Sequence, residues 1–340
     1  MSLVSPIQLV FTGPQHELNG SSSMRIVLDT DLAMGAPGSD IDDGFALALA
    51  HADPEIQLDL ITTVNGNTDV ESATILTGEL ANRLGLKDVP IVKGASAAYT
   101  HPEITRTPAG NVLALRNTAQ QPTPGYAAAA IADHIVAHPG EITLVAIGPL
   151  TNVAAALVLE PRIATAVKEI VIMGGMFFGT MPSRDMPGEF NVWVDPEAAQ
   201  AVLRSGAPQR WVGLDVTLQV RLTRDHARRM LDADSPFAPF AGESTLAWID
   251  HMAARNPGSA IDANSCAMHD PLAVAVLTRP ELCEFREVTV SVVTGDGEAR
   301  GVMITDRREG AEPPPPNARV AVAVDANAFT ERFLGLITDL

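Results

Sequence analysis

The sequence predicts an α/β protein with an open, mostly parallel sheet flanked by helices. Short strand-like runs alternate with helix-like segments along most of the 340 residues, as in parallel sheets covered by helices. Polar residues gather directly after several of these runs, where open α/β sheets build their sites. Hydrophobic residues make up 46% of the chain but aromatic residues only 4%, which suits a layered core rich in Ala, Val, Leu and Ile.

Each element follows from a local pattern of apolar residues and of turn formers. The predicted order is strand 24–28, a helix from residue 44, strand 58–64, helix 70–84, strand 89–93, a surface excursion over 94–125, helix 127–137, strand 141–147, a helix opening at 151, strand 169–173, a β-hairpin formed by 288–293 and 301–305, strand 319–324 and helix 326–338. Gly85 is expected to end the second helix, and Thr151 with Asn152 to cap the helix that they open. The turn formers Gly295 and Gly297 predict the small C-terminal hairpin.

The two ends of the chain differ in expected order. Residues 1–23 lack the basic start and long apolar segment of a signal peptide, so we expect a poorly ordered N-terminal extension. Residues 24–340 contain no convincing linker and are expected to form one domain.

Charge and cysteine content exclude several classes of partner. The net charge of −18 and pI near 4.7 argue against nucleic acid and anionic membranes, which would be repelled. No apolar run is long enough to span a membrane. The only cysteines, Cys266 and Cys283, do not suggest a disulfide scaffold, so we expect a cytoplasmic protein acting on a small molecule.

Five aspartates lie within fifteen residues after the first strand, at positions 29, 31, 40, 42 and 43. So many carboxylates in one turn repel one another unless a cation holds them together. A hard divalent metal is therefore the first inference. An EF-hand does not fit, because its loop needs an oxygen ligand at the fifth position and Gly at the sixth, and counting from Asp29 these are Ala33 and Met34.

Other polar clusters recur at the ends of predicted strands. A parallel sheet would bring them to one edge although they are far apart in sequence. Together these strings resemble the inosine-uridine preferring nucleoside hydrolase family from about Arg25 to the C-terminus. The matching segments are 28–31 (LDTD), 42–43 (DD), 63–67 (TVNGN), 147–152 (IGPLTN), 160–161 (EP), 173–175 (MGG), 189–191 (EFN), 195–198 (DPEA) and 269–271 (HDP).

The resemblance implies a nucleoside-hydrolase fold, a tightly bound Ca²⁺, and hydrolysis of ribonucleosides to ribose and free base. It also implies a role in nucleoside salvage or catabolism and a homo-oligomer, either a dimer or a tetramer. The chemistry is physically consistent, since cleavage of an N-glycosidic bond develops positive charge on the ribose, which carboxylates stabilise. Calcium takes several oxygen ligands, can bind vicinal hydroxyls and lowers the pKa of a bound water.

Roles follow from the resemblance position by position. Asp31 is expected to bind Ca²⁺ and to act as general base, and His269 to protonate the departing base. The other expected metal ligands are Asp43, Asp270 and the backbone carbonyl of Ile147, where many members of the family have Thr. The residues expected to hold the ribose or lie beside it are Asp42, Asn67, Met173, Glu189 and Asn191.

The chain departs from the family pattern in three places. Most members separate the second Asp from the Asp-Asp pair by about three residues, whereas here residues 32–41 intervene; we expect this segment to bulge outward. The His-Gly loop of many members is not evident over 95–110. Tyrosines that often cover the base are absent, and Trp248 and His251 lie in that region, so the base preference stays open. We expect Asp29 to be a structural carboxylate directed away from Asp31, and Asp40 a turn or cap residue.

Three other readings remain. A haloacid-dehalogenase-like Mg²⁺ phosphatase also begins with a strand ending in Asp-x-Asp, but it does not account for the DD, EFN and HDP segments together. A dinucleotide-binding dehydrogenase is disfavoured because no G-x-G-x-x-G follows the first strand. A non-catalytic Ca²⁺-dependent ribose-binding protein is the third, and release of free base would separate it from an enzyme.

Overall fold

A computed structural model of the chain describes residues 23–104, 106, 110–181, 185–308 and 314–340. The expectation that residues 1–23 are poorly ordered therefore concerns a segment that, apart from Ser23, lies outside the described residues.

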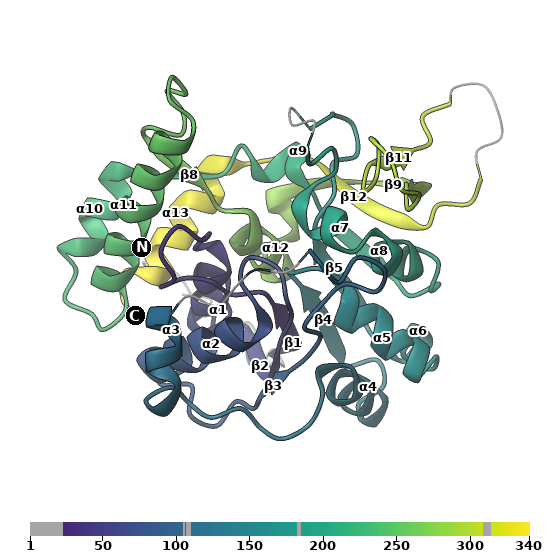
Figure 1. Ribbon diagram of the computed structural model, residues 1–340, viewed down its shortest axis with the longest axis horizontal. Helices are drawn as coiled ribbons and strands as arrows, with labels where there is room; N and C mark the ends of the chain where they lie inside the picture. The colour runs from purple at the N-terminus through teal and green to yellow at the C-terminus, as the bar shows by residue number, and fades with distance from the viewer. Residues whose placement is uncertain (1–22, 105, 107–109, 182–184, 309–313) are drawn as a thin grey trace, which may run out of the picture.

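A single large sheet organises the described residues (Figure 1). Its eight strands lie in the order β3 (Ile91–Lys93), β2 (Ile56–Thr63), β1 (Met24–Thr30), β4 (Ile142–Ala146), β5 (Glu169–Met173), β6 (Gln209–Val212), β12 (Ala318–Val324) and β9 (Cys283–Val288). Neighbours are parallel except β12 and β9, which run antiparallel. The predicted α/β class with a mostly parallel sheet is confirmed.

Helices cover both faces of this sheet. On one face lie α1 (Asp42–Ala52), α2 (Val70–Leu84), α12 (His269–Thr278) and α13 (Ala326–Ile337); on the other lie α4 (Ala127–Ala137), α5 (Thr151–Leu159) and α8 (Pro196–Leu203). Successive strand residues alternate between the two cores: Ile26 and Leu28 pack with the α1 side and Val27 with the α4 side. Both faces are buried, which explains the continuous apolar runs of the strands.

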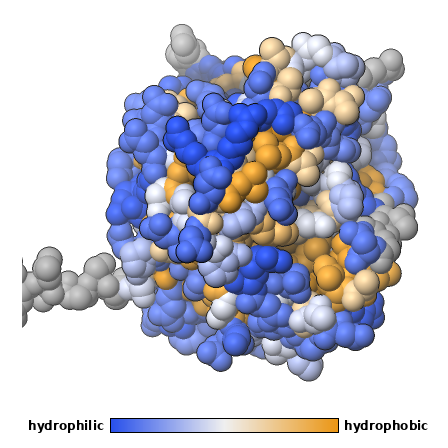
Figure 2. All heavy atoms as spheres, turned by 90° about the vertical axis from the view of Figure 1, so that its left-hand side faces the viewer, coloured by the Kyte–Doolittle hydropathy of each residue, from blue (hydrophilic) through white to orange (hydrophobic). Residues whose placement is uncertain are grey.

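Smaller elements surround the sheet. These are α3 (Gly110–Leu113), α6 (Ile163–Ala166), α7 (Phe190–Val194), α9 (Leu214–Thr217), α10 (Arg224–Leu231), α11 (Ala238–Arg255), two 3₁₀ turns (Ala114–Asn117 and Pro280–Leu282), the pair β7 (Arg221–Thr223) and β8 (Ser265–Ala267), and the antiparallel pair β10 (Val290–Val292) and β11 (Met303–Thr305). The last pair is the predicted C-terminal hairpin. The α10 and α11 side of the molecule is largely hydrophilic, with apolar side chains gathered in patches (Figure 2). None of the helices in the described ranges has the length and apolar character needed to cross a membrane.

Two local predictions need correction. Helix α5 does begin at Thr151, but its N-cap is Leu150 and no side chain caps it; Asn152 is fully buried and bonds elsewhere. The excursion over 94–125 includes a short helix, α3, followed by a 3₁₀ turn. The helix over 70–84 has the predicted bounds, and Gly85 ends it in the left-handed conformation at φ 76°.

The strand order reverses between β1 and β4, because the chain moves to one side of β1 through β2 and β3 and to the other through β4 and β5. Such a reversal opens a crevice at the carboxyl ends of the two strands. Asp31 follows β1 and Ile147 follows β4, so this crevice lies where the predicted site residues begin.

Candidate active site

Four carboxylates converge at this crevice from three segments of the chain. Asp31 follows β1, Asp42 and Asp43 form the first turn of α1, and Asp270 lies in the first turn of α12. The helix starts favour negative charge, since unpaired backbone N–H groups point outward there. All four side chains are buried, with at most 3% of their surface exposed.

Asn67, in the loop after β2, ties Asp31 to Asp43. Its backbone N–H donates to Asp31 Oδ2 at 2.6 Å, and its side-chain Nδ2 donates to Asp43 Oδ2 at 2.9 Å. The Thr30 hydroxyl donates to the other oxygen of Asp43. The remaining oxygen of Asp31, Oδ1, is buried without a hydrogen-bond partner.

Asp42 links α1 to α12. Its Oδ2 accepts the backbone N–H groups of His269 and Asp270, each at 3.1 Å. Asp42, Asp43 and Asp270 each offer an oxygen within 4.8 Å of the others. The resemblance implied Asp31 rather than Asp42 as a metal ligand, whereas the three carboxylates whose oxygens lie within 4.8 Å of one another include Asp42.

Burial and mutual repulsion raise the pKa values of these carboxyls. The pKa of Asp42 rises to about 7, through burial first and the charge of Asp43 second, and that of Asp43 rises to about 6, chiefly through burial. Burial raises the pKa of Asp31 well above its ordinary value, with Asp43 adding to the effect. The pKa of Asp270 is raised by burial and by its neighbours Asp42 and Asp43.

The donor set fits a hard divalent cation. All the groups are oxygens, as Ca²⁺ and Mg²⁺ prefer, and no lysine or arginine of the described ranges forms an ion pair with any of the four carboxylates. The unpartnered Oδ1 of Asp31 is costly in a buried site unless a cation or a ligand satisfies it. A bound cation would reduce the repulsion among the carboxylates and would give Oδ1 of Asp31 a partner.

Three of the five residues predicted to lie at the ribose come from β5 and the start of α7: Met173, Glu189 and Asn191. Glu189 caps α7: its carboxylate accepts N–H groups from Gly175, Asn191 and Val192 at 2.9–3.1 Å. Asn191 Nδ2 donates to the Ile147 carbonyl at 2.8 Å, so this predicted metal ligand accepts a hydrogen bond here. The same nitrogen lies 3.3 Å from the Met173 carbonyl and 3.6 Å from its sulfur.

His269 is the first residue of α12. Its Nδ1 lies 2.7 Å from the Thr217 hydroxyl, which leaves Nε2 for a ligand. Burial lowers the pKa of His269, while the charge of Asp40 acts in the opposite direction.

A cavity of about 670 Å³ opens above the carboxylates. Eight of the ten predicted site residues line it, namely Asp42, Asn67, Ile147, Met173, Glu189, Asn191, His269 and Asp270. The other two, Asp31 and Asp43, lie beneath the lining and are bonded to it through Asn67. One end of the cavity is acidic, whereas Phe190, Trp193 and Trp248 contribute aromatic surface.

Asp29 and Asp40, the two aspartates that were expected to have structural roles, have different surroundings. Asp29 is buried, and its Oδ1 accepts from the Thr62 hydroxyl and from Asn152 Nδ2. Strand alternation was the wrong reason for separating Asp29 from Asp31, because residues two apart in a strand point to the same face. Strand β1 ends at Thr30, so Asp31 lies beyond the strand and does not follow its alternation. Asp40 accepts from the Ile41 N–H as a turn residue and also lines the cavity, and burial followed by the charge of Asp42 raises its pKa to about 8.

Sequence reasoning missed Trp193, which lines the cavity, and Thr217, which contacts His269. Trp193 follows Glu189 by four positions, and helical spacing on α7 could have indicated it. Thr217 carries no local signal, because only the tertiary fold brings it to His269.

Comparisons with known proteins find similarity over most of the chain. The model of the family described as inosine-uridine preferring nucleoside hydrolase matches residues 26–331. The non-specific ribonucleoside hydrolase RihC of Salmonella typhimurium is 35% identical over 320 residues, which cover 92% of this chain and 96% of that protein. Among solved structures, the plant nucleoside hydrolase PpNRh1 superposes with a TM-score of 0.81 at 27% identity, covering 93% of this chain and 99% of that one. A purine-preferring ribonucleoside hydrolase from Gardnerella vaginalis gives a TM-score of 0.78 at 29% identity, over 92% and 98% of the two chains.

Proposed function

This chain belongs to the inosine-uridine preferring nucleoside hydrolase family and is a nucleoside N-glycosidase, and from that premise we propose that it uses Ca²⁺ to hydrolyse ribonucleosides to ribose and free base. The observation that carries the proposal is the convergence of Asp31, Asp42, Asp43 and Asp270 beneath a cavity lined by eight of the predicted site residues.

In this proposal the cation is held by Asp31, Asp43, Asp270 and the Ile147 carbonyl, with Asp42 directed to a ribose hydroxyl. When bound, Ca²⁺ would neutralise the carboxylates and polarise the oxygen atoms that touch it. The closeness of Asp42 to Asp43 and Asp270 supports a second arrangement in which Asp42 is also a ligand. Loss of metal affinity in an Asp42→Asn variant would favour that arrangement.

Asp31 is the proposed general base. Its Oδ2 is fixed by the Asn67 N–H at 2.6 Å, while Oδ1 has no partner and can receive a proton. A water oxygen forms a bond to the anomeric carbon, Asp31 takes a proton from that water, and the bond to the base nitrogen breaks. The positive charge that develops on the ribose is stabilised by the surrounding carboxylates.

His269 is the proposed acid for the departing base. Thr217 fixes the ring through Nδ1, so a proton on Nε2 would pass to the base nitrogen as the glycosidic bond breaks. Asn67, Glu189 and Asn191 would orient the ribose, with Met173 packing beside it, because all four line the same cavity.

A nucleoside panel tests the proposal. Purified protein loaded with Ca²⁺ is incubated with inosine, adenosine, guanosine, uridine and cytidine, and both free base and reducing sugar are measured. We expect release of both in equal amounts, with loss of activity after chelation and recovery with Ca²⁺. Turnover of a phosphoester with Mg²⁺ but of no nucleoside would favour the phosphatase, and ribose binding without base release would favour a binding protein.

Three broader proposals accompany this one: that residues 24–340 form one domain, that the protein is a dimer or tetramer, and that it works in the cytoplasm on salvaged nucleosides. The two cysteines, Cys266 and Cys283, are buried and form no disulfide, which is compatible with a reducing compartment. Light scattering on the purified protein would test the oligomeric state.

A further inference from the structure

The segment 32–41, which separates Asp31 from Asp42, lies against helix α11 on one side of the cavity. We propose that this segment, here called the inserted loop, is a specificity-determining part of the site that acts through His251 to fix the ring of Trp248. The inference rests on the proposed function, since it assigns the side of the cavity that receives the nucleobase.

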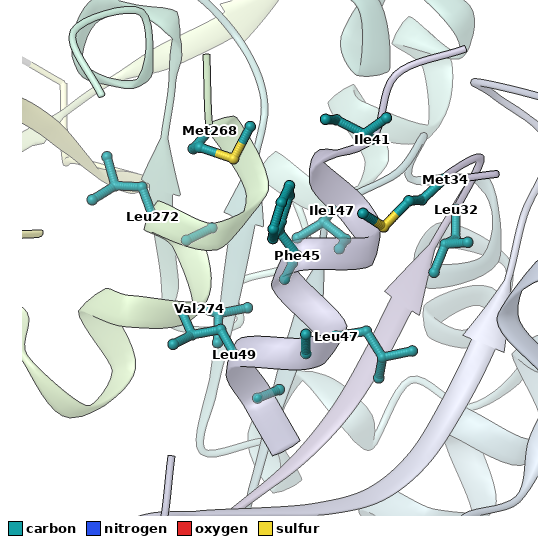
Figure 3. Close-up of a cluster of buried hydrophobic side chains, with 14 of the residues drawn as sticks. Leu32, Met34, Ile41, Phe45, Leu47, Leu49, Ile147, Met268, Leu272 and Val274 are labelled. Atoms are coloured by element: carbon teal, nitrogen blue, oxygen red, sulfur yellow. The ribbon is translucent and has the colours of Figure 1, made fainter. Parts of the chain in front are cut away.

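The inserted loop is anchored at both ends. Leu32, Met34 and Ile41 are at most 3% exposed and join the buried cluster around α1 (Figure 3). Gly35 lies between two elements, since a Cβ built on it would be 3.3 Å from Leu76 of α2 and 3.9 Å from Phe240 of α11. The loop therefore has a buried apolar base that holds its turn in place.

The turn of the loop meets α11 at Gly38. This residue has φ +73°, which favours glycine, and a Cβ built on it would lie 3.0 Å from His251 Cε1. The His251 ring stacks on the Trp248 indole, with centroids 5.3 Å apart and an interplanar angle of 9°. The imidazole thus contacts the Trp248 indole and lies directly beside the Gly38 backbone, where glycine leaves it just enough space.

Gly38 and Trp248, the two partners of His251, border the cavity. Gly38 and Asp40 of the loop line it, as do Trp248, Met252 and Arg255, which fall at helical spacing on one side of α11. The four carboxylates that would hold the cation and a ribose hydroxyl come from the end of β1 and from α1 and α12 instead. For a nucleoside whose ribose lies at the carboxylates, the proposal places the flat base on the side of the cavity that Trp248 lines.

The position of the indole then controls how well a base packs. Aromatic surfaces gain most when they overlap in a fixed, offset geometry. His251 holds one face of Trp248, so loss of the imidazole would free the indole to rotate and would weaken base binding. Ribose chemistry should be unaffected, because within the described residues neither His251 nor Gly38 forms a hydrogen bond with any of the four carboxylates.

The test compares three variants with a control. His251→Ala removes the stacked ring, His251→Phe keeps a ring of similar shape, and Gly38→Ala pushes a methyl group against the imidazole. Glu243→Gln, at an exposed position of α11, is the matched control. For each enzyme, kcat and KM are measured with a purine nucleoside, a pyrimidine nucleoside and an aryl riboside that has no nucleobase.

We expect His251→Ala and Gly38→Ala to change the purine to pyrimidine ratio of kcat/KM by about five- to tenfold, mainly through KM. His251→Phe and Glu243→Gln should stay within about twofold of the wild type. Tryptophan emission gives a second readout, with Trp248→Phe used to identify the contribution of that ring. Increased quenching of Trp248 by acrylamide in His251→Ala, reversed in His251→Phe, would report the freed indole directly.

The outcomes separate the two proposals. Wild-type protein that releases no base from any nucleoside would overturn the proposed function and this inference with it. Wild-type protein that releases base, together with unchanged ratios and unchanged Trp248 quenching in His251→Ala, would overturn only the inference.

Discussion

Asp31 combines a fixed oxygen with a free one. Its Oδ2 is held by the Asn67 N–H, and its Oδ1 is buried without a partner. Asp31→Asn keeps the size of the side chain and removes its ability to take a proton. We expect base release to fall by at least about 100-fold, while the metal-free protein should melt at the same or a higher temperature because one buried charge is lost. Release of free base at the wild-type rate by this variant would contradict the general-base role.

Asn152 lies at the same crevice as Asp31, and its side chain connects neighbouring segments of the chain. Its side chain donates to Asp29 Oδ1 at 2.8 Å and to the Thr63 carbonyl at 3.0 Å, and it accepts the Ala95 N–H at 2.8 Å. The sequence placed it at a helix start, where a cap was the simplest reading, but side-chain partners on three other segments cannot be read from local sequence.

Asn152→Ala leaves these buried groups unpaired. We expect a loss of about 2–4 kcal/mol in the free energy of unfolding, measured by denaturant titration. Asn327→Ala, at an exposed position of α13, is the control and should change stability by less than about 0.5 kcal/mol. An Asn152→Ala protein as stable as the control would show that the three bonds carry no net stability.

At the scale of elements, the loops after the strands approach Asp31 so closely that they require glycine. A Cβ built on Gly66, after β2, would lie 1.9 Å from Asp31 Oδ2, and one on Gly148, after β4, would lie 3.0 Å from Asp31 Oδ1. The strings containing these glycines were recognised in the sequence, but the reason for glycine there is a contact between segments. It becomes visible only once β1, β2 and β4 are placed side by side.

Gly66→Ala should therefore displace the Asp31 carboxylate. We expect at least a tenfold loss of base release and a destabilisation of about 1–3 kcal/mol. Gly335→Ala is a matched control, because a Cβ there meets nothing within 4 Å and the residue lies within helix α13. This control should gain up to about 1 kcal/mol, as followed by thermal melting. A Gly66→Ala enzyme with unchanged rate would mean that Asp31 tolerates displacement.

At the scale of the whole molecule, six of the eight sheet strands were predictable, because they are apolar runs separated by helices and glycine stops. Strands β6 (QRWV) and β9 (CEFREV) mix charged and polar residues with apolar ones and were not predicted. The helix over 70–84 and the strand over 169–173 have the predicted bounds. Helices α10 and α11 were not predicted. The side of the cavity that Trp248 of α11 lines was therefore not predicted either. The site residues that follow strands could be recognised from motifs, whereas only the tertiary fold brings Thr217 to His269 and Asp40 to the cavity.

The carboxylate cluster also makes the stability of the whole molecule depend on pH and metal. In unfolded chains an Asp titrates near pH 4, whereas in the folded protein the pKa of Asp43 is about 6 and that of Asp42 about 7. Between these values the folded state binds more protons than the unfolded state, so stability falls as pH rises from about 4 to about 7. A bound divalent cation opposes this loss, because it stabilises the ionised carboxylates of the folded state only.

We therefore expect the melting temperature of metal-stripped protein to fall between pH 5 and pH 8 more steeply than that of protein in excess Ca²⁺, the gap being widest at pH 8. At 100 times Kd the cation should add about 2.7 kcal/mol to the free energy of unfolding. Carboxylates far from the site, such as Asp53 with its lowered pKa beside Thr278 and Arg332, contribute equally to both profiles, so the difference between the profiles isolates the cluster. Asp43→Asn should narrow that difference, since it removes one of the closest carboxylates. Parallel profiles for the stripped and loaded wild-type protein, after verified metal removal, would show that no cation binds at these aspartates.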